Sequence, residues 1–447
     1  MDPSGPPSWE ADVVLRDGHT VRIRPITPDD GDGLVRFHDR QSAESVYFRF
    51  FSPRPRLSER DVDHFTRVDL HDRVAFVAEL GDELIGVARY ERYEGTDTAE
   101  VAFFVDDEHH GRGLATLMLE YLAAAGRENG ISRFAASTLP NNRKMLGVFT
   151  AAGYDVATHL EDGVVDVAFD IRPTDEVAAA VARRERMAEA ASVRRLLAPS
   201  TVAVVDAGGE DPADGPSRAA AVARQVTAGG FTGSVHTVLA DPGGAPGGAV
   251  AGSTAAASVA DLPDGIDLVV LTGGAAAVPG VLDACGAKHM GGAVVLSSGF
   301  SEAGPQGAAL ERELVRAARG HGMRVVGPNS LGLLNTDPAV NLRAVPVASS
   351  PPAGPIGILS ESGTLAAAIL DHAERIGLGV STFVAAGTPA DVTAADLLSY
   401  WTDDESTGSV LLYLASRRLS SRFVRSARAA SLAKPVAALH TSLGPTS

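Results

Sequence analysis

The stretch that decides the fold of the N-terminal third is His109-His110-Gly111-Arg112-Gly113-Leu114-Ala115-Thr116. It follows an apolar run at 99–105 that is typical of a strand, and it opens a helical pattern that ends near Gly126. Glycine lets a ligand approach the backbone closely, and a helix N-terminus favours anions. The order strand, glycine loop, helix therefore predicts a site that fits a diphosphate, to which Arg112 can add a charge-assisted contact.

The segments around this loop predict a small α/β domain over residues 12–173, after a Pro-rich tail over residues 1–11 that we expect to be disordered. Asp17-Gly18 is typical of a tight hairpin turn. The patterns predict strands at 74–78, 84–90, 99–105 and 133–138, and helices at 29–42, 58–68 and from 143 to 152.

The segment from His110 to Ala115 resembles the cofactor loop of the GNAT N-acetyltransferases, and Asn142 with Gly153-Tyr154 is similar to a later segment of that family. The resemblance covers about residues 12–172 and implies a mixed, V-splayed sheet with acetyl-CoA as the acyl donor. It implies that the pyrophosphate lies on main-chain amides of His110, Gly111, Arg112, Gly113, Leu114, Ala115 and Thr116, with pantetheine along Phe103, Phe104 and Val105 and with Asn142 nearby. His110 departs from the family's usual glutamine or arginine.

Acyl transfer to an amine needs a base, because the amine arrives as ammonium. Glu100 lies on the strand whose family equivalent lines the acceptor channel, so we take Glu100 as the base; the alternative is a solvent-facing glutamate on an alternating strand. The family often has a tyrosine acid where this chain has Phe149, so water is expected to protonate the leaving thiolate. No metal site is expected, since the adjacent His109 and His110 rarely direct both rings at one ion.

Residues 174–197 predict one polar helix, a connector that a threonine caps. Beyond it, continuous apolar strands alternate with helices over residues 198–350 and again over 351–447. This pattern predicts two further α/β domains with largely parallel sheets.

Four motifs in the C-terminal half resemble the ADP-forming acyl-CoA synthetases. They are Ser298-Gly299-Phe300-Ser301-Glu302, Gly327-Pro328-Asn329-Ser330-Leu331-Gly332, Leu359-Ser360-Glu361-Ser362-Gly363-Thr364 and Ala390-Asp391-Val392. The resemblance implies a Rossmann-like CoA-binding domain and a flavodoxin-like, succinyl-CoA-synthetase-like domain. The family's phosphorylated histidine and its ATP-grasp domain have no counterpart in this sequence.

Acidic residues stand where that family would hold phosphate groups. Asp206, Glu210 and Asp211 surround the first turn, and Glu361 lies at a helix start. We therefore interpret this half as a degenerate, regulatory or assembly region; whether it binds CoA or another metabolite stays open.

Charge, hydropathy and cysteine content limit the classes of partner and the cellular compartment that we expect. A net charge of -17 disfavours nucleic acid, and no apolar run is long enough to span a membrane. Cys285 is the single cysteine, and the first residues do not resemble a signal peptide, so a cytoplasmic location is expected. Only Lys144, Lys288 and Lys434 are lysines among 39 basic residues.

A GNAT domain fused to such a synthetase-like region resembles the bacterial protein lysine acetyltransferases. The resemblance implies an acyl-CoA-dependent N-acetyltransferase that acetylates lysine ε-amines of proteins, acyl-CoA synthetases among them. Two alternatives stay open. One is a transferase for a small-molecule amine. The other is a non-enzymatic CoA or metabolite sensor, or a subunit-like partner of a separate ATP-grasp ligase chain. Homo-oligomerisation is compatible with the sequence.

Overall fold

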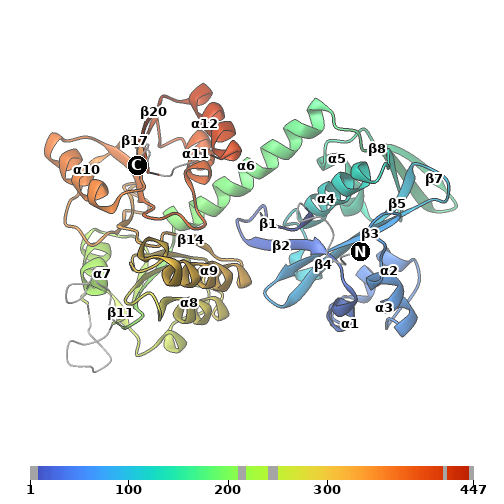
Figure 1. The fold of residues 1–447 in the computed structure, drawn as a ribbon, viewed down its shortest axis with the longest axis horizontal. Helices are drawn as coiled ribbons and strands as arrows, with labels where there is room; N and C mark the ends of the chain where they lie inside the picture. The colour runs from blue at the N-terminus through green and yellow to red at the C-terminus, as the bar shows by residue number, and fades with distance from the viewer. Residues whose placement is uncertain (1–8, 210–217, 240–249, 416–419, 442–447) are drawn as a thin grey trace. The chain divides into compact units, whose positions relative to one another are not determined.

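The computed structural model describes residues 9–209, 218–239, 250–415 and 420–441. The chain divides into two compact units, Met1–Glu185 and Arg186–Ser447, each of which is described by itself (Figure 1). Residues 1–8 of the expected tail lie outside the described residues. Within the rest of that tail, Trp9 is buried in the core and Ala11 begins the first strand.

An eight-stranded sheet forms the centre of the first unit, in the order β1-β2-β3-β4-β5-β6-β8-β7. Only the β5–β6 pair is parallel, so the sheet is mixed. Its strands are β1 (Ala11–Val14), β2 (Thr20–Pro25), β3 (Arg73–Leu80), β4 (Glu83–Arg92), β5 (Thr98–Val105), β6 (Arg133–Thr138), β7 (Ala157–Glu161) and β8 (Val164–Asp170). Its helices are α1 (Gly31–Asp39), α2 (Ala43–Phe50), α3 (Glu59–Thr66), α4 (Leu114–Glu128) and α5 (Arg143–Ala151).

Helices cover both faces of this sheet because alternate residues of β3, β4 and β5 are apolar on each face. On one face α4 buries Met118 and Leu122 in a cluster with Phe76. On the other face α1 buries Phe37 against Phe104 of β5, with ring centroids 5.2 Å apart. Each such side chain contributes about 1.5–3 kcal/mol by its burial.

The second unit begins with a six-stranded parallel sheet in the order β11-β10-β9-β12-β13-β14. The strand order reverses between β9 and β12, as in a Rossmann-like fold. The elements are β9 (Thr201–Asp206), α7 (Arg218–Ala228), β10 (Ser234–Val238), β11 (Thr254–Ala255), β12 (Leu268–Thr272), α8 (Val278–Ala287), β13 (Gly292–Val295), α9 (Pro305–Gly320) and β14 (Arg324–Val326).

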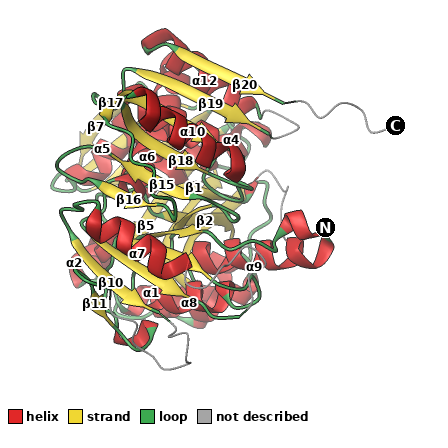
Figure 2. Cartoon of the chain, turned by 90° about the vertical axis from the view of Figure 1, so that its left-hand side faces the viewer, coloured by secondary structure: helices red, strands yellow, loops and turns green. Residues whose placement is uncertain are grey.

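A second sheet of this unit has the order β16-β15-β18-β17-β19-β20. Its elements are β15 (Gly332–Asn335), β16 (Leu342–Ala344), β17 (Ala353–Ser360), α10 (Gly363–Ile376), β18 (Val380–Ala385), α11 (Ala394–Asp403), β19 (Ser409–Leu414), α12 (Ser421–Ala433) and β20 (Val436–His440). In Figure 2 the strands are yellow and the flanking helices, such as α7 and α10, are red.

The short strands β15 and β16 were not expected from the sequence. They pair antiparallel with each other, and β15 pairs antiparallel with β18. This sheet therefore starts before residue 350, where the domain boundary was placed. One apolar cluster joins both sheets, with Val294, Leu333, Leu359 and Trp401 among its buried members.

The connector is the single helix α6 (Asp175–Leu197), whose first turn is capped by the Thr174 hydroxyl accepting a hydrogen bond from the Val177 amide. The boundary between the two units, Glu185 to Arg186, falls inside this helix. Within the first unit, Ala180 lies close to Gly153, and within the second Val193 and Leu196 join the apolar cluster.

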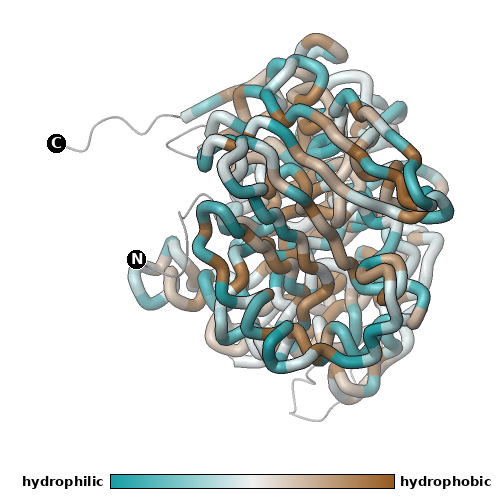
Figure 3. Tube along the Cα trace, turned by 90° about the vertical axis from the view of Figure 1, so that its right-hand side faces the viewer, coloured by the Kyte–Doolittle hydropathy of each residue, from teal (hydrophilic) through white to brown (hydrophobic). Residues whose placement is uncertain are grey.

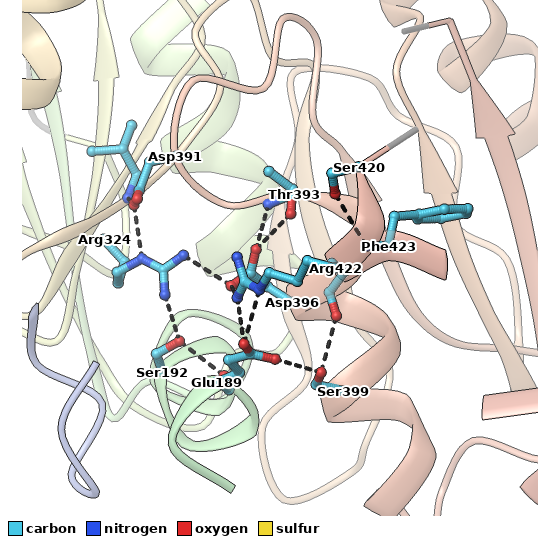
Figure 4. A network of polar contacts seen from close by, with 12 residues as sticks. Glu189, Ser192, Arg324, Asp391, Thr393, Asp396, Ser399, Ser420, Arg422 and Phe423 are labelled. Carbon is cyan, nitrogen blue, oxygen red and sulfur yellow. Dashed lines mark hydrogen bonds and ion pairs between the residues drawn. The ribbon is translucent and has the colours of Figure 1, made fainter. Parts of the chain in front are cut away.

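A buried polar network holds the C-terminal half of α6 within the second unit (Figure 4). Arg324 of β14 donates to Asp391 (2.8 Å), to Asp396 (3.1 Å) and to the Ser192 hydroxyl of α6 (3.0 Å). Arg422 of α12 donates to the same Asp396 oxygen (2.7 Å) and to Glu189 of α6 (2.9 Å). Two guanidinium groups therefore share one fully buried carboxylate.

Among the described residues, no helix is both long enough and apolar enough to cross a lipid bilayer. Figure 3 is consistent with this finding, since hydrophobic and hydrophilic residues alternate over short distances along the trace.

Candidate functional site

The candidate site lies in the first unit, where two neighbouring strands separate. β5 and β6 are paired only from Thr98↔Arg133 to Glu100↔Ala135, although both strands continue for several residues. Beyond Glu100 the edge of β5 that faces β6 has no partner strand, so its backbone groups can pair with an extended ligand. A cavity of about 970 Å³ lies at this opening.

The glycine loop forms one wall of that cavity. Gly111 and Gly113 have φ values of +78° and +86°, a conformation that favours glycine. Space is open where a Cβ on Gly111 would lie, and at Gly113 the nearest atom to a Cβ would be Arg16 Cβ at 3.8 Å. Gly113 caps α4 without a side-chain hydrogen bond, so the first amides of the helix stay available to an anion.

Hydrogen bonds of the loop's side chains fix its shape. The His110 Nε2 lies 3.0 Å from the carbonyl oxygen of Val105, which can only accept, so the ring donates. Arg112 donates to Asp17 and contacts His109. Although burial alone would raise it, the pKa of Asp17 is lowered by hydrogen bonds from His19 and Arg112. Burial, with Arg112 nearby, lowers the pKa of His109.

The Arg112 side chain turns to Asp17 in the β1–β2 hairpin and is not among the described residues that line the cavity. Its charge-assisted contact with a diphosphate stays a prediction. The other residues that the sequence singled out all line the cavity: Glu100, Phe103, Phe104, Val105, His110, Gly111, Gly113, Leu114, Ala115, Thr116 and Asn142.

Glu100 occupies the end of the paired part of β5, directly where the strands separate. Its neighbours Ala99 and Val101 are buried on the α4 side, whereas Glu100 is exposed on the face that α1 and α2 cover. A carboxylate at this point can accept a proton from a group that enters the cavity. Among the described residues there is no cluster of three or more metal-ligating side chains.

Asn142 and Phe149 have structural roles as well. The Asn142 side chain caps α5 by accepting a hydrogen bond from the Met145 amide (3.2 Å). Phe149 is fully buried, and its ring centroid lies 6.1 Å from that of Phe103. No tyrosine is among the described residues that line the cavity, so a phenolic acid is absent from its described wall.

Sequence reasoning missed the contribution of α2 to the site. It placed one helix over 29–42, whereas α1 ends at Asp39 and a separate helix, α2, brings Ser45, Phe48 and Arg49 to the cavity. The signal that could have found α2 is Ser42, whose hydroxyl accepts a hydrogen bond from the Ser45 amide as an N-cap. Arg16, Arg143 and Lys144 add positive charge to the wall.

In the second unit, acidic side chains at the strand ends are engaged by the protein's own backbone. Glu361, at the start of α10, accepts a hydrogen bond from the Ala415 amide (2.8 Å). Asp206, at the end of β9, accepts from the Gly208 amide (2.9 Å). Glu210 and Asp211, which were expected to add negative charge to this turn, lie outside the described residues.

A mixed sheet that opens beside a glycine loop and a helix N-terminus, with a carboxylate at the opening, defines an acetyltransferase domain of the GNAT class. Family models agree with this assignment: the acetyltransferase (GNAT) family matches residues 40–154. A CoA binding domain matches residues 200–336, and the succinyl-CoA ligase like flavodoxin domain matches residues 353–445. The chain therefore combines a GNAT domain with CoA-binding and succinyl-CoA ligase-like domains, as the sequence predicted.

Similar proteins cover different parts of the chain. It is 53% identical to the GNAT domain of S. lividans PAT in a crystal structure, over 37% of this chain and 98% of that one, with a TM-score of 0.36. It is 30% identical over 168 residues to acetyltransferase Pat of Mycolicibacterium smegmatis, covering 37% of this chain and 50% of Pat.

The C-terminal half resembles ligases. The chain is 33% identical over 245 residues to the alpha subunit of the ADP-forming acetate–CoA ligase I of Pyrococcus furiosus, covering 55% of this chain and 52% of the subunit. It spans only about a quarter to a half of the length of such curated relatives.

Proposed function

We propose that this chain is an N-acyltransferase that moves the acetyl group of acetyl-CoA to the lysine ε-amine of an acceptor protein. The observation that carries the proposal is the position of Glu100 where β5 and β6 separate, in a cavity whose other wall is the glycine loop. Similarity to acetyltransferase Pat supports acetyl transfer, and the resemblance of the domain combination to bacterial protein lysine acetyltransferases favours a protein acceptor.

In this mechanism Glu100 takes a proton from the lysine ammonium. The amine nitrogen then attacks the thioester carbonyl carbon, so that a C–N bond forms, the C–S bond breaks and CoA leaves as a thiolate. The nitrogen gives its second surplus proton to water and becomes a neutral amide. Because an ordinary thiol has a pKa of about 8.5, the thiolate leaves readily near neutral pH and takes its proton from water. The amides from Gly111 to Thr116 hold the pyrophosphate, and Arg16, Arg143 and Lys144 complement its charge.

The second unit has a regulatory role in this proposal. Glu361 and Asp206 accept hydrogen bonds from backbone amides at strand ends. The resemblance to the synthetases implies that phosphate groups would bind at these ends, where the two carboxylates would repel them. An effector that binds two arrangements of this unit with different affinity would change the rate or target choice of the transferase.

The test is transfer of radiolabel from acetyl-CoA to protein fractions, compared with polyamines and free amino acids as acceptors. Incorporation into protein lysines, identified by comparing acetylomes with and without the protein, is the expected result. Transfer only to small amines would show that the acceptor is a small molecule and not a protein. Transfer to neither class of acceptor would contradict the proposed activity.

A second candidate is a subunit-like partner of a separate ligase chain, which the similarity to a ligase alpha subunit favours. It predicts formation of acyl-CoA from acid, CoA and ATP once an ATP-grasp chain is added. Acetyl transfer to lysine without any added chain would favour the transferase instead.

A further inference from the structure

The face of the first sheet that carries Glu100 also carries a group of charged residues. Arg89 and Glu91 of β4 lie in register with Ala102 and Glu100 of β5, on the face that α2 covers. Arg49 of α2 reaches the same region, since its electrostatic neighbours include Arg89, Glu91 and Glu100, and Arg54 is a further neighbour.

The arginines in this group differ in whether a carboxylate forms an ion pair with them. Arg54 forms an ion pair with Asp61 (3.1 Å), and Arg89 forms one with Glu91 (3.4 Å). Arg49 has no ion pair and no hydrogen bond with any described residue; its guanidinium group lies over the Phe50 ring, 5.1 Å from the centroid. Arg49 is therefore the member of this group that lines the cavity without a close counter-ion.

Burial, together with the nearby Arg89 and Arg54, lowers the pKa of Arg49 to about 9 against the opposing effect of Glu100 and Glu91. The group still carries its proton at neutral pH. A partly buried cation of this kind gains most from a ligand that brings a negative charge, because a charge-assisted hydrogen bond is the stronger kind.

We propose that Arg49 is a specificity-determining residue that binds a carboxylate of the acceptor protein, on an Asp or Glu near the acetylated lysine. This inference rests on the proposed protein lysine acetyltransfer. Arg49 belongs to α2, on the face of the sheet toward which Glu100 projects, so it lies on the side from which the amine would enter. Glu44 and Glu100 in the same wall would attract the ammonium while Arg49 pairs with the neighbouring carboxylate.

The test uses the full chain, acetyl-CoA and pairs of peptides that contain one lysine flanked by either Glu or Gln. We expect the wild-type chain to favour the Glu peptide about tenfold or more in kcat/KM, the scale of one charge-assisted hydrogen bond. Arg49→Met should reduce this ratio to about one by raising KM for the Glu peptide much more than for the Gln peptide, and Arg49→Lys should restore part of the preference.

Arg54→Met is the matched control, since Arg54 also lies over the Phe50 ring (4.9 Å) but is paired with Asp61 and is not among the described residues of the cavity wall. It should keep the preference for Glu. Equal losses on both peptides in Arg49→Met, or an unchanged preference, would overturn the assignment. A preference of the wild type for succinyl-CoA that Arg49→Met abolishes would also overturn it, because Arg49 would then bind the acyl chain. If neither peptide is acetylated, the proposed function itself fails.

Discussion

At the scale of single residues, the proposed chemistry depends on one carboxylate. Glu100→Gln keeps the size of the side chain but removes its ability to take a proton. We expect turnover to fall about 100-fold or more, the scale of a lost general base, with little change in acetyl-CoA affinity. Steady-state kinetics and calorimetry measure the two quantities. Glu94→Gln, an exposed position outside the cavity wall, is the control and should stay active. Wild-type turnover in Glu100→Gln would assign the role to another group.

In the proposed function, donor binding depends on a second single residue, Gly113. A glutamate there would place a carboxylate where the diphosphate approaches the backbone, in a conformation that glycine adopts most readily. We expect Gly113→Glu to abolish acetyl-CoA binding in calorimetry. Gly130→Glu is the matched control, because Gly130 has a similar φ of +76° and open space but does not line the cavity. If both variants bind as the wild type does, the glycine loop is not the donor site.

At the scale of elements, the shared carboxylate Asp396 links α11 with β14 and α12. Burial would raise the pKa of Asp396, but Arg324 and Arg422 lower it to about 2. Since the unfolded group has a pKa of about 3.9, its contribution to stability is complete above about pH 4 and is lost as the pH falls towards 2. That contribution is about 2–3 kcal/mol in this window.

We therefore expect Asp396→Asn to destabilise the second unit by about 3 kcal/mol or more at pH 7, because it leaves two buried guanidinium groups without their carboxylate. The difference from the wild type should shrink between pH 4 and pH 2. Urea unfolding followed by Trp401 fluorescence, in a Trp9→Phe background, measures both effects. The exposed Asp403→Asn removes a pair with Arg186 and should cost less than about 1 kcal/mol. Equal effects of the two variants would contradict the role of the network.

The elements also show what the sequence could and could not predict. The strands beside the glycine loop and the long helix α6 were predicted, because their apolar spacing and caps are local signals. The separate helix α2 was not predicted, because the predicted helix ends at Ser42, the residue that caps α2. The ion pair of Arg112 with Asp17 was not predicted either, because the two residues are 95 positions apart in the sequence.

At the scale of the whole molecule, every described residue of the cavity wall lies between Arg16 and Ala151, inside the first unit. A fragment of residues 1–185 should therefore fold and bind acetyl-CoA with a Kd within about threefold of the full chain, whereas its response to metabolites should be lost. Calorimetry and transfer assays on both forms decide this. A fragment that is folded by circular dichroism but does not bind would show that the second unit completes the donor site.

The scarcity of lysine in this chain has a consequence for self-acetylation. Lys288 is paired with Asp264 at 2.7 Å, and the Lys434 ammonium donates to the carbonyl oxygens of Trp401 and Asp404. An ammonium held in this way is a poor nucleophile, because it must lose a proton and its hydrogen bonds before it can react. Of the three lysines, only Lys144 stands in the cavity wall. If the proposed transfer to lysine ε-amines holds, a chain with three lysines offers few acceptors of its own, so its acetyl groups should pass to other proteins.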